Sequence, residues 1–172
     1  MKKIFGAVVF SAAVMMGLHA TAQDDKSKRP SPPAKVSETI SSGATVTIDY
    51  SQPSVKGRTI GKEIAPYGEV WRTGANEATV FETSKDLKIE GKTLPAGKYS
   101  LYSIPGKETW TFIFNKVWNQ WGTVYNQSED ALRVVVKPGK APQFMEKMTF
   151  NIDKKGKISL LWGDIRVDMK AK

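Results

Sequence analysis

The sequence has no cysteine and a single histidine, His19, which lies in a predicted export signal. The lack of cysteine excludes disulfides, thiol nucleophiles and thiolate metal sites. Removal of the export signal would also remove His19, so a Ser-His-Asp triad and histidine-ligated zinc or copper are excluded from the mature chain. Carboxylates, lysine, arginine, tyrosine and hydroxyl groups remain for chemistry. A metal bound by them would be a hard cation such as Ca²⁺, and we predict neither a metal site nor a cofactor.

Residues 1–22 predict a cleavable signal peptide. Lys2 and Lys3 form a positively charged start, an apolar run covers residues 4–18, and Ala20-Thr21-Ala22 has the small residues of a cleavage site. The apolar run is shorter than the roughly 20 residues that span a bilayer. We therefore expect cleavage after Ala22, a periplasmic or secreted chain, and no transmembrane segment after cleavage.

Positive charge exceeds negative charge in this chain. The formal net charge of +9 includes Lys2 and Lys3, so the mature chain would carry +7. An anionic partner, such as an acidic glycan or a lipid headgroup, would fit this balance. The lysines are spread along the chain without a dense cluster, which favours a second interpretation: they keep a β-rich surface soluble and protect sheet edges. No nucleic-acid-binding motif is present, so we expect no nucleic-acid partner.

Two regions are expected after the signal peptide. Residues 23–35 are charged, rich in proline and poor in apolar side chains, which predicts a disordered linker. Residues 36–172 show short apolar runs separated by glycine and proline turns, which predicts one all-β domain, an antiparallel β-sandwich or a jelly-roll-like barrel. The predicted strands are residues 45–50, 70–72, 79–83, 87–89, 98–104, 110–115, 132–137, 144–152 and 158–162.

The C-terminal stretch admits two alternatives, because Gly163-Asp164 either forms a two-residue hairpin or lies within one long strand. The alternatives bring different apolar residues onto one face. With a hairpin these are Ile158, Leu160, Trp162, Ile165, Val167 and Met169, and with a continuous strand they are Leu161, Ile165, Val167 and Met169.

The segment 66–79 (PYGEVWRTGANEAT) is the first candidate site. A core-building segment rarely combines a large aromatic residue, a guanidinium, an amide and carboxylates around small residues. Arg72, Asn76 and Glu77 would converge on a polar recognition site at a β-turn, with Trp71 or Tyr67 as its apolar floor. In the structural alternative, Trp71 is in the core, Arg72 pairs with Glu77 or Glu69, and Asn76 bonds the turn backbone.

The segment 118–126 (WNQWGTVYN) is the second candidate. Trp118, Trp121 and Tyr125 alternate with amide side chains, a composition typical of sugar-stacking surfaces, where C–H faces pack on aromatic rings and amides bind hydroxyls. The alternative is a hydrophobic plug that closes one end of the sandwich.

Several segments together resemble a known family. They are residues 50–58 (YSQPSVKGR), 66–79, 94–105 (LPAGKYSLYSIP), 110–115 and 119–122 (NQWG). They are similar to a family of exported bacterial proteins, domain of unknown function 2911, over about residues 36–169. The WRTGANE block is the most specific part of the resemblance. The family has no assigned activity, so the resemblance implies no catalytic residue.

The sequence therefore predicts non-catalytic binding of a small molecule, a glycan or an envelope component. Arg72, Asn76 and Glu77 would recognise polar groups, while Trp118, Trp121 and Tyr125 would stack. One alternative is a carboxylate-based hydrolase that uses Glu69 or Glu77, although such an enzyme needs two carboxylates at a defined separation. The other is a structural module that contacts envelope proteins. The oligomeric state is not predicted.

Overall fold

Within residues 25–172, which the computed structural model describes, the chain forms ten β-strands and two short 3₁₀ helices. Their bounds are η1 Lys26–Lys28, β1 Pro33–Thr39, β2 Thr45–Ser51, β3 Val80–Thr83, β4 Leu87–Ile89, β5 Lys92–Leu94, β6 Gly97–Ile104, β7 Trp110–Asn115, η2 Gln127–Glu129, β8 Asp130–Val136, β9 Pro138–Ile152 and β10 Lys157–Lys170. The predicted signal peptide, residues 1–22, lies outside the described residues. In the described part, no helix has the length and apolar character to cross a membrane.

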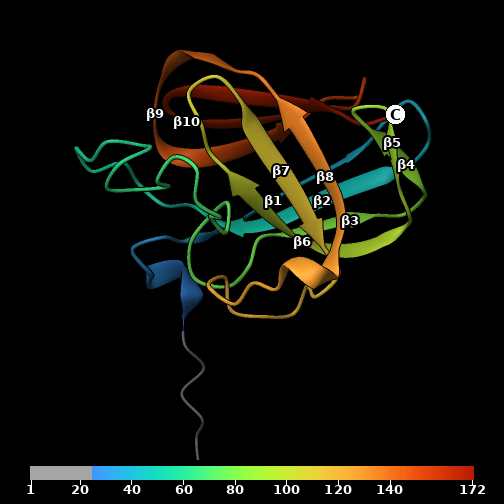
Figure 1. The fold of residues 1–172 in the computed structure, drawn as a ribbon, viewed down its shortest axis with the longest axis horizontal. Coiled ribbons are helices and arrows are strands. Elements are labelled where there is room, and N and C mark those ends of the chain that lie inside the picture. The colour runs from blue at the N-terminus through green and yellow to red at the C-terminus, as the bar shows by residue number, and fades with distance from the viewer. Residues whose placement is uncertain (1–24) are drawn as a thin grey trace, which may run out of the picture.

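The strands form a sandwich-like fold. Six of them make one antiparallel sheet in the order β1-β2-β3-β6-β7-β8. The hairpin of β9 and β10 packs against it, and β4 joins the end of this hairpin, because Lys88 and Lys172 exchange backbone hydrogen bonds of 2.8 and 3.0 Å. Figure 1 shows the long β9–β10 hairpin at the top and the loop between β7 and β8 at the bottom. The predicted antiparallel all-β class is confirmed, and the described strands form no closed barrel.

Strict alternation of apolar and polar residues explains how the large sheet turns one face to the core. In β2, for example, Val46 and Ile48 are fully buried, whereas Thr47 and Asp49 between them are partly exposed. Each fully buried large apolar side chain stabilises the fold by roughly 1.5–3 kcal/mol. The largest core contributors from both layers include Phe81, Leu101, Phe112, Phe114, Phe150, Leu160 and Trp162.

Eight of the nine predicted strand segments overlap observed strands, whereas β1 and β5 lie outside them. The ninth, residues 70–72, is not a strand, since it contributes only an isolated β-bridge between Trp71 and Ser103. The segment predicted as a disordered linker, residues 23–35, differs from its prediction over its described part. η1 lies within it, and β1 begins at Pro33, which pairs with Ser51 of β2. An ion pair between Arg29 and Glu77 also holds the segment. The composition of the segment did not indicate that it is ordered, because its partners in β2 and at Glu77 lie far along the chain.

β10 is one continuous strand through Gly163, so the hairpin alternative at Gly163-Asp164 is wrong. Gly163 has a positive φ of 57°, and the pairing of β10 with β9 shifts register on both of its sides. Such a bulge changes which residues face inward. Trp162 before it and Val167 after it are therefore both buried, whereas Leu161, which the continuous-strand alternative assigned to the core face, is only partly buried.

Candidate functional site

The two predicted segments are neighbours in the fold. The polar segment (residues 66–79) and the aromatic loop (residues 118–126) are joined by backbone hydrogen bonds, one of which runs from Gly122 N to Asn76 O at 3.1 Å. A further β-bridge of one residue pair joins the segments. Residues about fifty positions apart in sequence thus form one surface, at the end of the molecule opposite the β9–β10 hairpin (Figure 1).

Trp71 and Arg72 point to opposite sides of the large sheet. The backbone of Trp71 pairs with that of Ser103 in β6, through hydrogen bonds of 2.7 and 2.8 Å. The indole of Trp71 enters the core, where it stacks on Trp162 at a ring distance of 5.3 Å and meets Trp110 edge-on at 6.3 Å. This placement agrees with the structural alternative for Trp71. Since neighbouring residues of an extended chain alternate, Arg72 projects from the outer face.

Arg72 lines a cleft of about 320 Å³ on this outer face. The cleft lies between the polar segment, strand β6 and the aromatic loop, and we call it the Arg72 cleft. Its lining residues are Val70, Trp71, Arg72, Tyr102, Gly122, Thr123 and Tyr125. Tyr102 from β6 and Tyr125 from the loop form an aromatic pair, with ring centroids 4.9 Å apart and planes inclined at 59°. The cleft therefore combines one cation with the partly exposed ring of Tyr125, which packs against the buried ring of Tyr102.

The hydroxyl of Tyr102 ties β6 to the aromatic loop. It donates a hydrogen bond to the carbonyl of Val124 and accepts one from Gln120 Nε2 at 3.1 Å. Burial raises the pKa of Tyr102, although the nearby charge of Arg72 acts in the opposite direction. The ring of Tyr102 is thus held in a single position under the loop.

The hydroxyl of Tyr125 is held by a second set of partners. It donates to Asp130 Oδ2 at 2.8 Å and accepts from Arg133 Nη2 at 2.7 Å, while Arg133 Nε also donates to the same carboxylate oxygen. Burial and the hydrogen bond to Asp130 raise the pKa of Tyr125 to about 12. Both tyrosines of the cleft are therefore neutral at physiological pH and fixed before any ligand arrives.

Arg72 is the exception among the arginines of this chain. The other four donate side-chain hydrogen bonds to protein oxygens: Arg29, Arg58, Arg133 and Arg166. Within residues 25–172, Arg72 has neither a hydrogen bond nor a carboxylate partner, and of its three nitrogens only Nε is buried. A buried N–H without a partner costs roughly 1–3 kcal/mol. The predicted pairing of Arg72 with Glu77 or Glu69 is not formed.

Gly122 allows the loop to cross directly over Arg72. A Cβ atom at position 122 would lie 2.5 Å from Arg72 Cδ and 2.7 Å from the carbonyl oxygen of Asn76. Real Cβ atoms essentially never approach other atoms so closely. The glycine therefore fixes the path of the arginine side chain below the loop.

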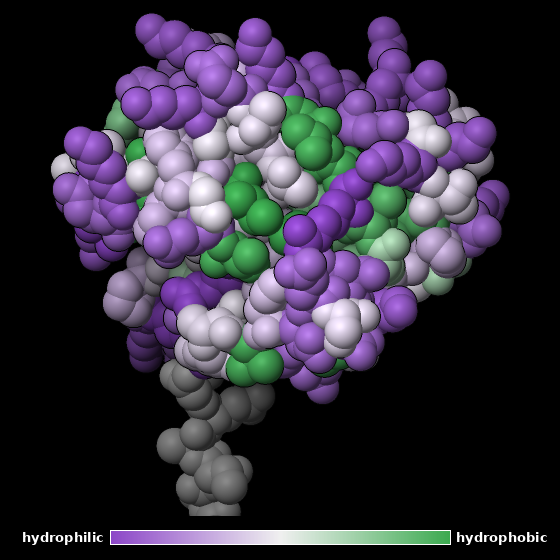
Figure 2. All heavy atoms as spheres, viewed as in Figure 1, coloured by the Kyte–Doolittle hydropathy of each residue, from purple (hydrophilic) through white to green (hydrophobic). Residues whose placement is uncertain are grey.

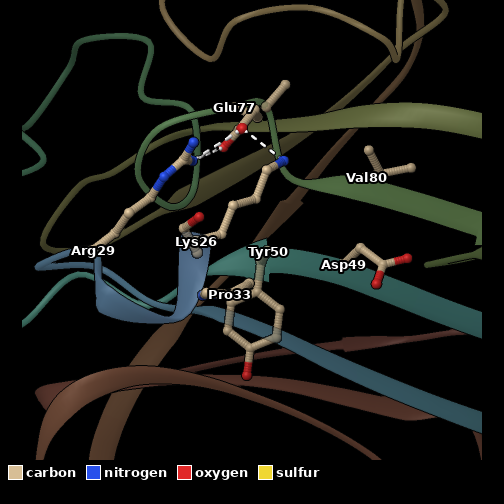
Figure 3. Close-up of a pocket in the computed structure, with 9 residues that line it drawn as sticks. Lys26, Arg29, Pro33, Asp49, Tyr50, Glu77 and Val80 are labelled. Carbon is tan, nitrogen blue, oxygen red and sulfur yellow. Dashed lines mark hydrogen bonds and ion pairs between the residues drawn. The ribbon is translucent and has the colours of Figure 1, made fainter. Parts of the chain in front are cut away.

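Glu77 faces away from Arg72 and binds the N-terminal segment. Its carboxylate accepts hydrogen bonds from Arg29 Nη1 at 2.9 and 3.0 Å and pairs with Lys26 Nζ at 2.9 Å. Figure 3 shows both cations meeting the carboxylate beside a small pocket of about 180 Å³. Partial burial opposes ionisation, but the hydrogen bonds from Lys26 and Arg29 outweigh it and lower the pKa of Glu77 to about 2.

Asn76 also binds the N-terminal segment. Its backbone has a positive φ of 60°, which asparagine tolerates better than most residues. Its Nδ2 donates to the carbonyl of Ser31 at 3.1 Å and to Ser51 Oγ at 3.3 Å. The structure therefore does not bring Arg72, Asn76 and Glu77 together around one ligand position, because Asn76 is bound to Ser31 and to Ser51 of β2, and Glu77 is bound to Lys26 and Arg29.

Of the predicted stacking residues, Trp118 and Trp121 are exposed and Tyr125 lines the cleft. The exposed fractions of Trp118 and Trp121 are 41% and 50%. Lys98 Nζ lies 5.0 Å from the ring centre of Trp118, within cation–π range. No cation of the described residues lies over the ring of Trp121 in this way. Figure 2 shows apolar and near-neutral residues exposed between polar ones at the lower end of this face, the end that carries the loop.

Tyr102 is the main site residue that the sequence did not predict. It belongs to a strand whose neighbouring residue, Leu101, is fully buried on the core side. Alternation places Tyr102 on the opposite face of the sheet, where another segment must pack on its ring to bury it. That segment is the aromatic loop, and the sequence does not indicate that this loop lies on this face.

The described residues offer no metal site, since no group of three or more His, Cys, Asp or Glu side chains among them could hold an ion. The lining of the Arg72 cleft contains no carboxylate either. Neither Glu69 nor Glu77, the residues of the hydrolase hypothesis, lies there.

Comparison with known families gives one match. The model of a family described as protein of unknown function (DUF2911) matches residues 31–171. The matched range includes both layers of the fold and every candidate residue discussed above. No curated protein and no solved structure matches the chain in these comparisons.

Proposed function

The chain belongs to the DUF2911 family of proteins of unknown function, and we propose that it binds a small molecule or a glycan, without catalysis, in the Arg72 cleft. The single observation that supports this proposal is the guanidinium of Arg72, which has no partner within residues 25–172 and lies in one cleft with Tyr102 and Tyr125. Concave sites with aromatic walls and a few fixed polar groups are typical of ligand binding.

The cleft is preorganised, which favours binding. The aromatic loop is held to the polar segment by the bond from Gly122 to Asn76 and by a second one from Ala78 N to Gln120 O at 3.1 Å. Because the two tyrosines are also held by their hydroxyls, little side-chain entropy would be lost when a ligand binds. Trp121, half-exposed on the same loop, supplies a ring surface on which the apolar face of a sugar can stack.

Catalysis is not part of the proposal. Glu77, with its pKa of about 2, is ionised at neutral pH and cannot act there as a proton donor. Tyr125, with its pKa raised to about 12, remains protonated. A glycosidase would require two carboxylates on either side of the substrate, and the Arg72 cleft contains none.

The test is a thermal-shift screen of neutral and acidic oligosaccharides and of envelope lipids against the chain without residues 1–22. Any compound that raises the melting temperature is then tested on Trp121→Ala and Tyr102→Phe. A matched control is Phe144→Ala, which removes an equally exposed aromatic residue from β9. We expect the first two variants to weaken binding and the control to preserve it. If no compound stabilises the chain at high concentration, the proposal fails.

A further inference from the structure

We infer that the ligand of the Arg72 cleft carries a single carboxylate on a sugar ring, as a uronic acid does. This inference rests on the proposed function, because it names the ligand class of the same site. It is argued from the charge of the cleft, the restricted side chain of Arg72 and the rings beside it.

The charge of the cleft favours a monoanion. Arg72 is the one charged residue among its lining residues, and it lacks a carboxylate partner within the described chain. By contrast, Arg133, which lies behind Tyr125, is neutralised by Asp130 at 2.8 Å. One guanidinium balances one negative charge. A phosphate group, with a charge close to two, would find only half of the positive charge that it needs.

The open end of the guanidinium fits a planar acceptor. Nε is buried, while the two Nη groups are unburied and make no hydrogen bond to residues 25–172. Two parallel N–H groups on a planar fork match the two oxygens of a carboxylate. A neutral hydroxyl would occupy only one of these donors and would leave the charge unbalanced.

Gly122 lets the loop backbone restrict the aliphatic part of the Arg72 side chain. The loop backbone crosses the Arg72 side chain so closely that a Cβ at position 122 would overlap Arg72 Cδ. An arginine on an open surface loses much side-chain entropy when it binds an anion. Here the fold has already restricted the side chain, so that loss is reduced.

The rings beside the charge favour a sugar over a free carboxylate. Tyr125, which is partly exposed and packs against the buried ring of Tyr102, lies in the same cleft as Arg72, and Trp121 is half-exposed on the loop that covers it. A pyranose ring presents an apolar C–H face to the accessible rings of Tyr125 and Trp121 while its carboxylate reaches the guanidinium. A small inorganic anion would use only Arg72.

The experiment compares ligands that differ only in charge. Isothermal titration calorimetry measures binding of oligogalacturonate and oligomannuronate, and of their methyl esters, to the chain without residues 1–22. Because hydrogen bonds to charged groups contribute more than neutral ones, we expect at least one acid to bind roughly 10- to 100-fold more tightly than its ester. Raising NaCl from about 50 to 500 mM should weaken binding of the acid and leave the ester unchanged.

Two variants assign the effect to Arg72. In Arg72→Met the preference for the acid should disappear, while weak binding of the ester persists. Arg166→Met removes the same charge from β10, where Arg166 pairs with Asp168, and should keep the preference. The salt series on the unmodified chain keeps the inference testable if Arg72→Met does not fold.

The outcomes separate this inference from the proposed function. Equal binding of acid and ester overturns the inference and supports the proposed function. Binding of inorganic sulfate or phosphate as tight as that of the uronates also overturns it, because the sugar ring would then contribute nothing. Binding of none of these compounds overturns the inference, and the broader thermal-shift screen then decides the proposed function separately.

Discussion

The guanidinium of Arg29 donates from one nitrogen to both carboxylate oxygens of Glu77, at 3.0 and 2.9 Å. This contact joins a segment that precedes the first strand to a turn 48 residues later. It also explains why Glu77 does not pair with Arg72. The carboxylate is already neutralised on the far side of the turn, so the guanidinium of Arg72 is left without a partner among residues 25–172.

The first prediction concerns that contact. Glu77→Gln should lower the free energy of unfolding by up to about 1 kcal/mol, because two cations lose a half-exposed carboxylate and solvent screens much of the interaction. Hydrogen–deuterium exchange should accelerate in residues 25–31. Glu82→Gln is the matched control, since Glu82 pairs only with Lys98 at 3.4 Å. Unchanged exchange in Glu77→Gln would contradict the prediction.

The same carboxylate predicts a dependence on pH. The folded pKa of Glu77, about 2, lies below its usual value of 4.5. The stabilisation is therefore fully present above pH 4.5 and is lost as the pH falls from 4.5 towards 2. Urea unfolding of the original chain and of Glu77→Gln should give a difference that is constant from pH 7 to 5 and shrinks towards pH 2. A difference in unfolding free energy that grows as the pH falls would contradict the prediction.

Arg72→Met should leave the free energy of unfolding unchanged or raise it by about 1 kcal/mol. The substitution removes an unpaired buried N–H while it keeps an unbranched side chain under the loop. Urea unfolding monitored by tryptophan fluorescence measures the difference. A loss of more than about 1 kcal/mol would mean that Arg72 stabilises the fold through its charge, and would weaken its assignment to ligand binding.

Tyr125→Phe should lower the free energy of unfolding by about 1–2 kcal/mol, because Asp130 and Arg133 lose a hydrogen-bond partner. The control is Tyr67→Phe, whose hydroxyl makes no hydrogen bond within residues 25–172 and whose loss should change little. The folded pKa of Tyr125, about 12, lies above its usual value of 10. Its stabilisation is therefore complete below pH 10 and lost as the pH rises towards 12. Equal effects of the two variants would count against this network.

Gly122→Ala should lower the free energy of unfolding by about 1–3 kcal/mol, since the added methyl group overlaps Arg72 and the backbone of Asn76. Arg72→Ala in the same chain should recover part of this loss, because only the overlap with the side chain is relieved. A double-mutant cycle measures the coupling. Strict additivity would show that Gly122 does not constrain Arg72.

The strands of this protein could be predicted from sequence because alternation and turn residues are local signals. Eight of the nine predicted segments overlap β2, β3, β4 and β6 to β10. β1 was missed because proline and charge dominate the residues that precede it, and its order comes from pairing with β2. For β10 the hairpin alternative was wrong, but the residues that it assigned to one face are those that pack in the core. The bulge at Gly163, which depends on the register with β9, brings them to that face within one strand.

The candidate site was predictable only in part. Both segments that form it stand out by composition, and Arg72 and Tyr125 do line one cleft. The prediction that Asn76 and Glu77 would line a site together with Arg72 failed, because Asn76 binds Ser31 and Glu77 binds Lys26 and Arg29. No local pattern indicates which of several polar residues a distant segment will occupy.

By itself, the sequence determined the all-β class, most strand positions and the family, because alternation, turn chemistry and motif identity are properties of short stretches of chain. Only the tertiary structure decided that Arg72 has no partner in the described part of the chain and lies in one cleft with Tyr102 and Tyr125, while Glu77 is neutralised by Lys26 and Arg29. The physical reason is that ion pairing depends on which charges the fold brings within a few ångströms, and in this protein those charges come from segments far apart along the chain.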